Sequence, residues 1–115
     1  MNDMIKVLVV CSQNKMRSPT AEAIYRRDPR FTIRSAGLSK MSPRFLSQGD
    51  LMWADVVLYM EKEHLERIKN IYPKVSILRS INLDIPDEYQ YMDPELIEIL
   101  KEKIEVILVN LQTGH

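Results

Sequence analysis

The residues best suited to chemistry lie in one short segment, residues 11–18, which fits the pattern Cys-x5-Arg-Ser. The thiolate of a cysteine is a strong nucleophile, and the guanidinium of an arginine can donate two parallel N–H bonds to phosphate oxygens. Cys11 and Arg17 are therefore suited to attack and to hold a phosphoryl group, with a phosphocysteine as the intermediate.

The backbone of such a loop would assist the same chemistry. A loop that closes from a strand into a helix can turn several N–H groups inward, and the helix N-terminus adds partial positive charge. Both features favour a bound phosphate and the thiolate form of Cys11. We expect phosphate to contact the whole loop, namely Ser12, Gln13, Asn14, Lys15, Met16, Arg17 and Ser18.

Taken singly, these residues also have structural explanations. A lone cysteine after a buried strand is usually a small core residue, asparagine is a common turn former, and Ser18 could simply cap a helix. The combination of a buried strand, the Cys-x5-Arg-Ser-Pro pattern and a following helix is what favours the functional interpretation.

The elements that position the loop can be predicted from the flanking sequence. Residues 5–10 are mostly β-branched and apolar, which indicates a strand buried on both faces. After the loop, Ser18 is the expected N-cap and Pro19 the expected first helical residue. Asp28 and Pro29 should end this helix.

The rest of the chain alternates between strand and helix patterns. We predict strands at residues 31–36, 54–60 and 74–78, a helical turn at 50–53, and helices at 61–71 and from 93 onward. The last helix carries an apolar stripe made of Leu96, Leu100, Ile104, Ile107 and Leu111. This order predicts a single α/β domain over residues 1–115, a three-layer doubly wound fold with a four-stranded parallel sheet. Ligands of such sheets bind beyond the carboxyl ends of the strands, where the loop that begins at Cys11 lies.

Composition restricts the class of protein further. Sixteen basic and sixteen acidic residues cancel, so no overall charge attracts nucleic acid or an anionic membrane. The apolar runs are too short for a membrane span. The single cysteine excludes an internal disulfide and a zinc site built from several cysteines. We expect a cytoplasmic protein without metal or cofactor, and the oligomeric state stays open.

The sequence resembles the low-molecular-weight protein tyrosine phosphatases, as a short branch of that family. Residues 9–19 resemble the family's N-terminal signature, and residues 34–37, 50–60 and 85–89 resemble its second strand, its third strand and its acid loop. The resemblance implies that the first loop binds phosphate, that Cys11 attacks it and that Arg17 stabilises the transition state. It further implies that an aspartate on a distant loop donates a proton, and that the substrate is a phosphotyrosine protein or a small phosphoester.

Three features depart from the family pattern. Gln13 stands where glycine is frequent, and Met16 stands where many members carry a second cysteine that can protect the nucleophile as a disulfide. Residues 38–49 are an abbreviated version of one wall of the substrate cleft, which leaves specificity for phosphotyrosine open.

Two aspartates compete for the role of general acid. The family pattern is an aspartate followed by proline and an aromatic residue. Asp87 keeps the aromatic residue at Tyr89 but not the proline, whereas Asp93 is followed by Pro94 and then by Glu95. Because an aspartate before proline is well suited to open the last helix, Asp93 already has a structural role. We therefore predict Asp87 as the acid.

Other residues near the acid loop admit two interpretations. Tyr89 and Tyr91 could flank an aromatic phosphoester or merely pack the loop. His64 lies among glutamates and is expected to be exposed and not catalytic, and Trp53 is expected in the core. Two other functions stay open, a cysteine phosphocarrier and a phosphate- or phosphoprotein-binding module without turnover. Arg17 and a carboxylate acid favour hydrolysis over the phosphocarrier, whereas a binding module would keep Arg17 and could dispense with Cys11 and Asp87.

Overall fold

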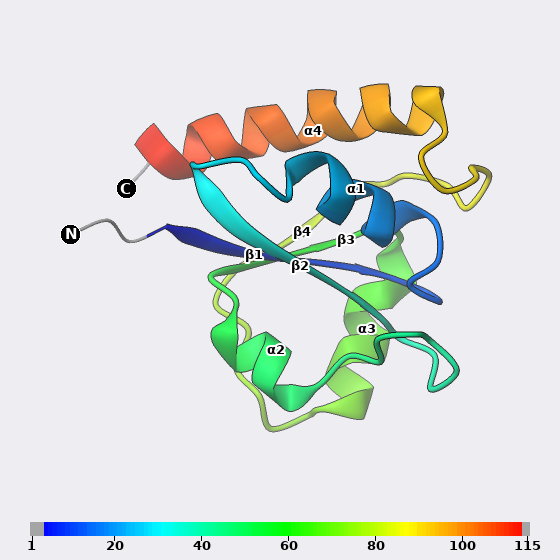
Figure 1. Cartoon of the computed structure of the whole chain (residues 1–115). Coiled ribbons are helices and arrows are strands. Elements are labelled where there is room, and N and C mark those ends of the chain that lie inside the picture. Colours follow the sequence, from blue (N-terminus) through cyan, green and yellow to red (C-terminus); the bar gives the residue numbers. More distant parts are fainter. Residues whose placement is uncertain (1–3, 114–115) are drawn as a thin grey trace.

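The computed structural model describes residues 4–113 and contains a four-stranded parallel sheet with the strand order β2-β1-β3-β4 (Figure 1). The strands are β1 (Ile5–Cys11), β2 (Phe31–Gly37), β3 (Val56–Tyr59) and β4 (Ser80–Asn82). β1 pairs with β2 along its whole length, so that Cys11 lies opposite Gly37, and it pairs with β3 on its other side. The predicted three-layer doubly wound fold is confirmed.

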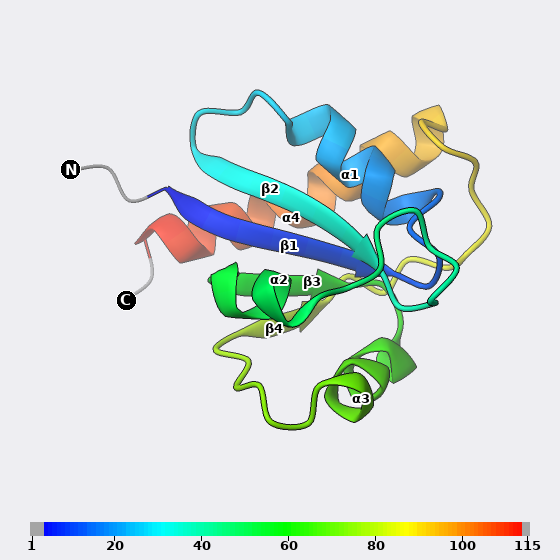
Figure 2. The same ribbon diagram turned by 60° about the horizontal axis from the view of Figure 1, so that its bottom comes forward.

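Helices cover both faces of the sheet. α1 (Arg17–Tyr25) and α4 (Pro94–Thr113) lie on one face, and α2 (Gln48–Trp53) and α3 (Lys62–Ile71) lie on the other, as Figures 1 and 2 show. Alternate residues of β1 serve the two layers: Val7, Val9 and Cys11 belong to the core beneath α1 and α4, while Leu8 and Val10 belong to the core beneath α2 and α3. This double burial explains why β1 is an unbroken apolar run.

The order of the strands determines where a ligand can bind. The chain leaves β1 toward β2 on one side, and β3 pairs with the other side of β1, so the connections diverge at the carboxyl end of β1. Such a divergence opens a crevice in parallel sheets. The loop from Cys11 to Arg17 lies at this point, between the end of β1 and the start of α1.

The position of the fourth strand was predicted wrongly. Residues 74–78 do not pair with the sheet; β4 begins at Ser80, which lies opposite Val57. Val75 and Ile77 instead pack, partly buried, against the core beneath α3. Their apolar pattern therefore reflects packing of an extended connection, and a three-residue edge strand leaves little pattern of its own.

Several helix boundaries also differ from the predictions. α1 begins at Arg17 with Met16 as N-cap and without a side-chain cap, so that Ser18 lies inside the first turn and is not the cap. α2 begins at Gln48, because Ser47 and Asp50 form a reciprocal capping box. In the last turns of α4, Leu108 is the buried residue, whereas Ile107 and Leu111 are partly buried.

Trp53 packs against the core beneath α2 and α3, as predicted, but is only partly buried there. Arg34 reaches over its indole ring, with the guanidinium carbon 4.0 Å from the ring centroid. A cation over an aromatic face is an attractive contact that keeps the ring near the surface. Within residues 4–113, none of the helices combines the length and the apolar character that crossing a membrane requires.

Candidate active site

The loop between Cys11 and Arg17 has its first carbonyl groups bonded to a neighbouring segment. The backbone N–H of Leu38 donates to the carbonyls of Cys11 and Ser12, at 3.1 and 3.0 Å, and the N–H of Ser39 donates to Ser12 at 2.9 Å. Within residues 4–113, the N–H groups of residues 12–16 have no protein acceptor. A loop with its carbonyls engaged outside and its N–H groups free is suited to surround an anion.

Asn14 holds the loop in this shape. Its φ of 53° lies in the left-handed region, which asparagine tolerates better than most residues. Its side-chain amide donates to the hydroxyls of Ser18 and Ser35, at 2.9 and 3.0 Å, and Ser35 donates to Glu22 at 2.5 Å. Asn14 therefore supports the loop from behind, tying it to α1 and β2.

Ser18 has a different role from the helix cap that its sequence position suggests. Its Oγ lies 3.0 Å from the sulfur of Cys11. Because Ser18 already accepts the N–H of Asn14, its own O–H proton is free to point at the sulfur. A hydroxyl donated to a thiolate stabilises the negative charge that makes the sulfur a nucleophile.

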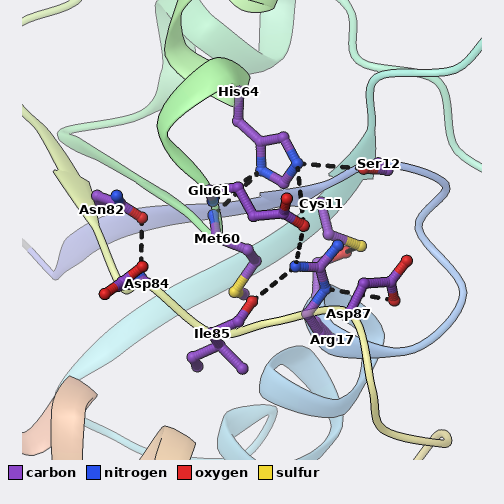
Figure 3. A network of polar contacts seen from close by, with 11 residues as sticks. Cys11, Ser12, Arg17, Met60, Glu61, His64, Asn82, Asp84, Ile85 and Asp87 are labelled. Carbon is purple, nitrogen blue, oxygen red and sulfur yellow. Dashed lines mark hydrogen bonds and ion pairs between the residues drawn. The ribbon is translucent and has the colours of Figure 1, made fainter.

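Arg17 is held in place by two acceptors, as Figure 3 shows. One of its terminal nitrogens, Nη1, donates to the carboxylate of Glu61 at 2.6 Å and to the carbonyl of Ile85 at 2.7 Å. The hydrogen bond from Arg17 lowers the pKa of Glu61, so this carboxylate stays ionised at neutral pH. The Nε of Arg17 lies 3.8 Å from Asp87. Anchoring through Nη1 leaves the Nε and Nη2 side of the fork for a phosphate.

His64 is buried, with 1% of its surface exposed, and the prediction that it is exposed is wrong. Its Nδ1 accepts the backbone N–H groups of Met60 and Glu61, both at 3.2 Å. Nε2 must then carry the proton, and it donates to the hydroxyl of Ser12 at 3.1 Å. The clue in the sequence was Ile68, which lies four residues further along the same helix and shares its buried face.

Burial also sets the charge of His64. The pKa of the imidazole is lowered to about 4, chiefly by burial and next by the nearby positive charge of Arg17, while Glu61 opposes both. At neutral pH the ring is therefore neutral. A neutral ring keeps Nδ1 as the acceptor of the two backbone N–H groups. Its Nε2–H contacts Ser12, so the ring also connects α3 to the first loop.

The predicted chemical groups meet around one small pocket. Its volume is about 140 Å³, and it is lined by Cys11, Ser12, Gln13, Lys15, Met16, Arg17 and Asp87. Asn14 and Ser18, which were also predicted to contact phosphate, stand behind this lining. Asp87 comes from the loop before α4 and its side chain is 62% exposed. The pocket thus combines a thiol, a fixed guanidinium, free backbone N–H groups and a carboxyl group.

Several solved structures resemble this chain over nearly its whole length. YfkJ from Bacillus subtilis is 24% identical, with 96% of each chain covered and a TM-score of 0.78. The tyrosine phosphatase Wzb from Escherichia coli K30, solved with phosphate, is 22% identical, covers 95% of this chain and 99% of its own, and has a TM-score of 0.76. The YwlE arginine phosphatase from Geobacillus stearothermophilus is 21% identical, with 96% and 98% covered and a TM-score of 0.68. No family model and no curated protein matches the sequence. The chain has the fold of the low-molecular-weight tyrosine phosphatases.

Within this phosphatase fold, the two candidate acids have separate positions. Asp93 caps α4: its Oδ1 accepts the N–H of Glu95 at 2.9 Å, and its carbonyl accepts the N–H of Ile97. Asp87 instead lines the pocket that contains Cys11. The structural role expected for Asp93 is therefore present, while the role of Asp87 as the acid stays a prediction.

The two tyrosines of the loop between β4 and α4 also differ in position. Tyr89 packs against the core beneath α4, and its hydroxyl lies 3.5 Å from Glu95. Tyr91 is 51% exposed and lines a neighbouring groove together with Lys15 and Met16. Neither tyrosine lines the pocket that contains Cys11.

Thr20 is a further residue at this site that the sequence did not single out. It is fully buried in α1, and its hydroxyl donates to the carbonyl of Met16 at 2.6 Å. The same oxygen accepts the backbone N–H of Met92, near the end of the loop between β4 and α4 that carries Asp87. Arg17 holds the start of this loop through Ile85. The loop between β4 and α4 is thus attached to α1 at both ends.

Proposed function

We propose that the protein is a phosphomonoester hydrolase, acting through a phosphocysteine on Cys11 with Asp87 as general acid. The observation that carries the proposal is that the sulfur, the guanidinium of Arg17 and the carboxyl of Asp87 line one pocket of about 140 Å³. A nucleophile, an anion clamp and a proton donor are the groups that transfer of a phosphoryl group from an ester requires.

In the first step, the thiolate of Cys11 attacks phosphorus and the bond from phosphorus to the ester oxygen breaks. Asp87, in its protonated form, delivers its proton to the departing oxygen, so the product leaves as a neutral alcohol or phenol. Arg17 and the free N–H groups of residues 12–16 hold the phosphoryl oxygens during the transfer. Ser18 supports the sulfur from behind at 3.0 Å.

In the second step, water attacks the phosphorus of the phosphocysteine. The carboxylate of Asp87 takes the proton from this water, and the bond between sulfur and phosphorus breaks. Inorganic phosphate leaves, and both Cys11 and Asp87 return to their starting forms. A YwlE arginine phosphatase variant solved with a phosphorylated active-site serine is consistent with a covalent intermediate at the equivalent place in that protein.

The substrate class we favour is an aryl phosphate, as in a phosphotyrosine protein. Solved relatives include both a tyrosine and an arginine phosphatase. In this chain Lys15 lies at the pocket lining beside Arg17. A phosphoarginine would bring its guanidinium toward Lys15, which forms no ion pair within residues 4–113, whereas the ring of phosphotyrosine carries no charge. A phosphotyrosine peptide should therefore be the better substrate when the two are compared at equal concentration.

A single assay separates hydrolysis from the two other functions. Purified protein should release p-nitrophenolate from p-nitrophenyl phosphate continuously, and added EDTA should leave the rate unchanged because the positive charge of the site comes from Arg17 and the backbone. A phosphocarrier would give one stoichiometric burst, and a binding module would give no product. Loss of activity with EDTA, restored by a metal, would contradict the mechanism.

The Cys11→Ser variant tests the nucleophile. Its turnover should fall below detection, because a serine hydroxyl in this site lacks the reactivity of a thiolate. Phosphate or vanadate should still raise the Tm of the variant, because the anion contacts come from the backbone and Arg17. Retained turnover would rule out the covalent scheme, and loss of the Tm shift would show that the loop itself has collapsed.

A further inference from the structure

A second groove adjoins the phosphate pocket and has no role in the proposed chemistry. It measures about 560 Å³, against about 140 Å³ for the pocket. Lys15 and Met16 line both cavities, so the groove begins where the pocket ends. Its lining includes Lys15, Met16, Pro19, Pro43, Gln90 and Tyr91.

Separate parts of the chain build this groove, and most of what they present is apolar. Met16 and Pro19 come from the start of α1, Pro43 from the connection between β2 and α2, and Tyr91 from the acid loop. Exposed apolar surface that is continuous with a polar site commonly marks a place where a ligand continues.

The charge of the groove is as informative as its apolar surface. Lys15 is the charged residue of the lining, and no carboxylate contributes to it. Within residues 4–113, Lys15 forms no ion pair. A positive group placed in the groove would therefore meet an unneutralised cation, while an apolar group would meet none of this repulsion.

We propose that the groove binds the residue adjacent to the phosphorylated residue of a polypeptide substrate, and that this adjacent residue is apolar. The inference rests on the proposed function and names its substrate class as a phosphorylated polypeptide. The small pocket accepts the phosphoryl group and the atoms that bear it, and the groove that opens beside Lys15 and Met16 receives the next part of the substrate.

The test measures binding of phosphotyrosine peptides to the Cys11→Ser variant, so it does not depend on turnover. Fluorescence anisotropy gives the Kd for peptides that carry leucine, alanine or lysine either immediately before or immediately after the phosphotyrosine. At one of these positions, we expect leucine to bind about five- to tenfold more tightly than alanine, the effect of partly burying one side chain. Lysine there should bind more weakly than alanine. Values within twofold at all positions would overturn the proposal.

Charge substitutions in the groove sharpen this test. Gln90→Glu in the Cys11→Ser background introduces a carboxylate into the lining, so the penalty on lysine should vanish or reverse at the same peptide position. Asn110→Glu, on the exposed surface of α4 and outside the groove lining, is the matched control and should change nothing. An equal response of the two variants would show a general charge effect and would contradict the assignment of the groove.

Turnover of p-nitrophenyl phosphate by the unmodified protein separates this proposal from the proposed function. If the small ester is hydrolysed but the peptide series is flat, the groove has no part in recognition. If the leucine preference is present without hydrolysis, the groove binds as proposed and the phosphatase function is wrong. If both are absent, both proposals fall.

Discussion

Thr20 and Met92 lie 72 residues apart in the sequence and are joined by a hydrogen bond of 2.9 Å from the N–H of Met92 to the hydroxyl of Thr20. Met92 has a φ of 62°, a left-handed conformation that few residues adopt without support. The same hydroxyl donates to Met16, the last residue before α1. The loop between β4 and α4 and the loop between β1 and α1 are therefore both fixed, near their ends, to one side-chain oxygen.

The Thr20→Val variant tests whether this link positions Asp87. Removing the hydroxyl leaves the N–H of Met92 without its partner and should lower the free energy of unfolding by about 1–3 kcal/mol. With phenyl phosphate, whose leaving group needs a proton, kcat/KM should fall about tenfold, within the range of a general acid. With p-nitrophenyl phosphate, whose leaving anion is stable, kcat/KM should change little, because this ratio reports the steps up to release of the leaving group.

The control for this variant is Thr20→Ser, which keeps the hydroxyl and should retain most of the activity toward both esters. Equal losses with both esters in Thr20→Val would mean that the hydroxyl supports the phosphate loop alone, and that it does not position the acid.

Asp87 and Asp93 form a matched pair for locating the general acid. Asp87→Asn should lower kcat/KM about 10²- to 10⁴-fold for phenyl phosphate, and less for p-nitrophenyl phosphate. Asp93→Asn should keep its activity and lose a few tenths to about 1 kcal/mol of stability, because asparagine also caps helices well. Kinetics and urea denaturation of the two variants decide the matter. A large kinetic loss at Asp93 with none at Asp87 would reverse the assignment.

His64 predicts how stability depends on pH. Burial lowers its pKa from 6.5 to about 4, so between these values the unfolded chain binds a proton that the folded chain does not. The free energy of unfolding should therefore fall as the pH decreases from 6.5 toward 4, by about 1.4 kcal/mol per pH unit from this group. Between pH 7 and pH 5 the expected loss is about 2 kcal/mol.

The His64→Asn variant separates this effect from that of the carboxylates, because asparagine does not titrate. Urea denaturation at pH 7 and pH 5 should show a smaller loss in the variant than in the unmodified protein. The carboxylates with lowered pKa, such as Glu61, titrate below their ordinary value of 4.5 and so lie outside this range. The same loss in both proteins would show that His64 is not the group responsible.

Peroxide sensitivity follows from the lone thiol. Hydrogen peroxide should oxidise the thiolate of Cys11 to a sulfenic acid and stop turnover, and no second cysteine is present to trap that form as a disulfide. Dithiothreitol should restore activity after brief exposure and progressively less after long exposure, as the sulfur oxidises further. Mass spectrometry of Cys11 follows the added oxygen atoms. Complete recovery after prolonged exposure would indicate an unexpected protective reaction.

The local part of the site could be predicted from the sequence. A buried apolar strand, the Cys-x5-Arg-Ser-Pro pattern and a helix adjoin one another in the chain, so residues close in sequence indicate the place of the loop at the carboxyl end of β1. The alternation of strands and helices indicated the parallel sheet, because crossover connections have one common hand. The helix cap at Asp93 was predictable for the same reason, since capping involves residues only a few positions apart.

Contacts between distant segments were decided by the tertiary structure alone. Nothing in the sequence near Arg17 indicates that Glu61 and Ile85 hold it, or that His64 is buried against Ser12. The neighbouring glutamates suggested an exposed helix face, yet α3 turns His64 inward because two backbone N–H groups at the end of β3 require its Nδ1. Such pairings depend on which strand ends meet at the crevice. That arrangement follows from packing both faces of the sheet at once, and no short stretch of sequence contains it.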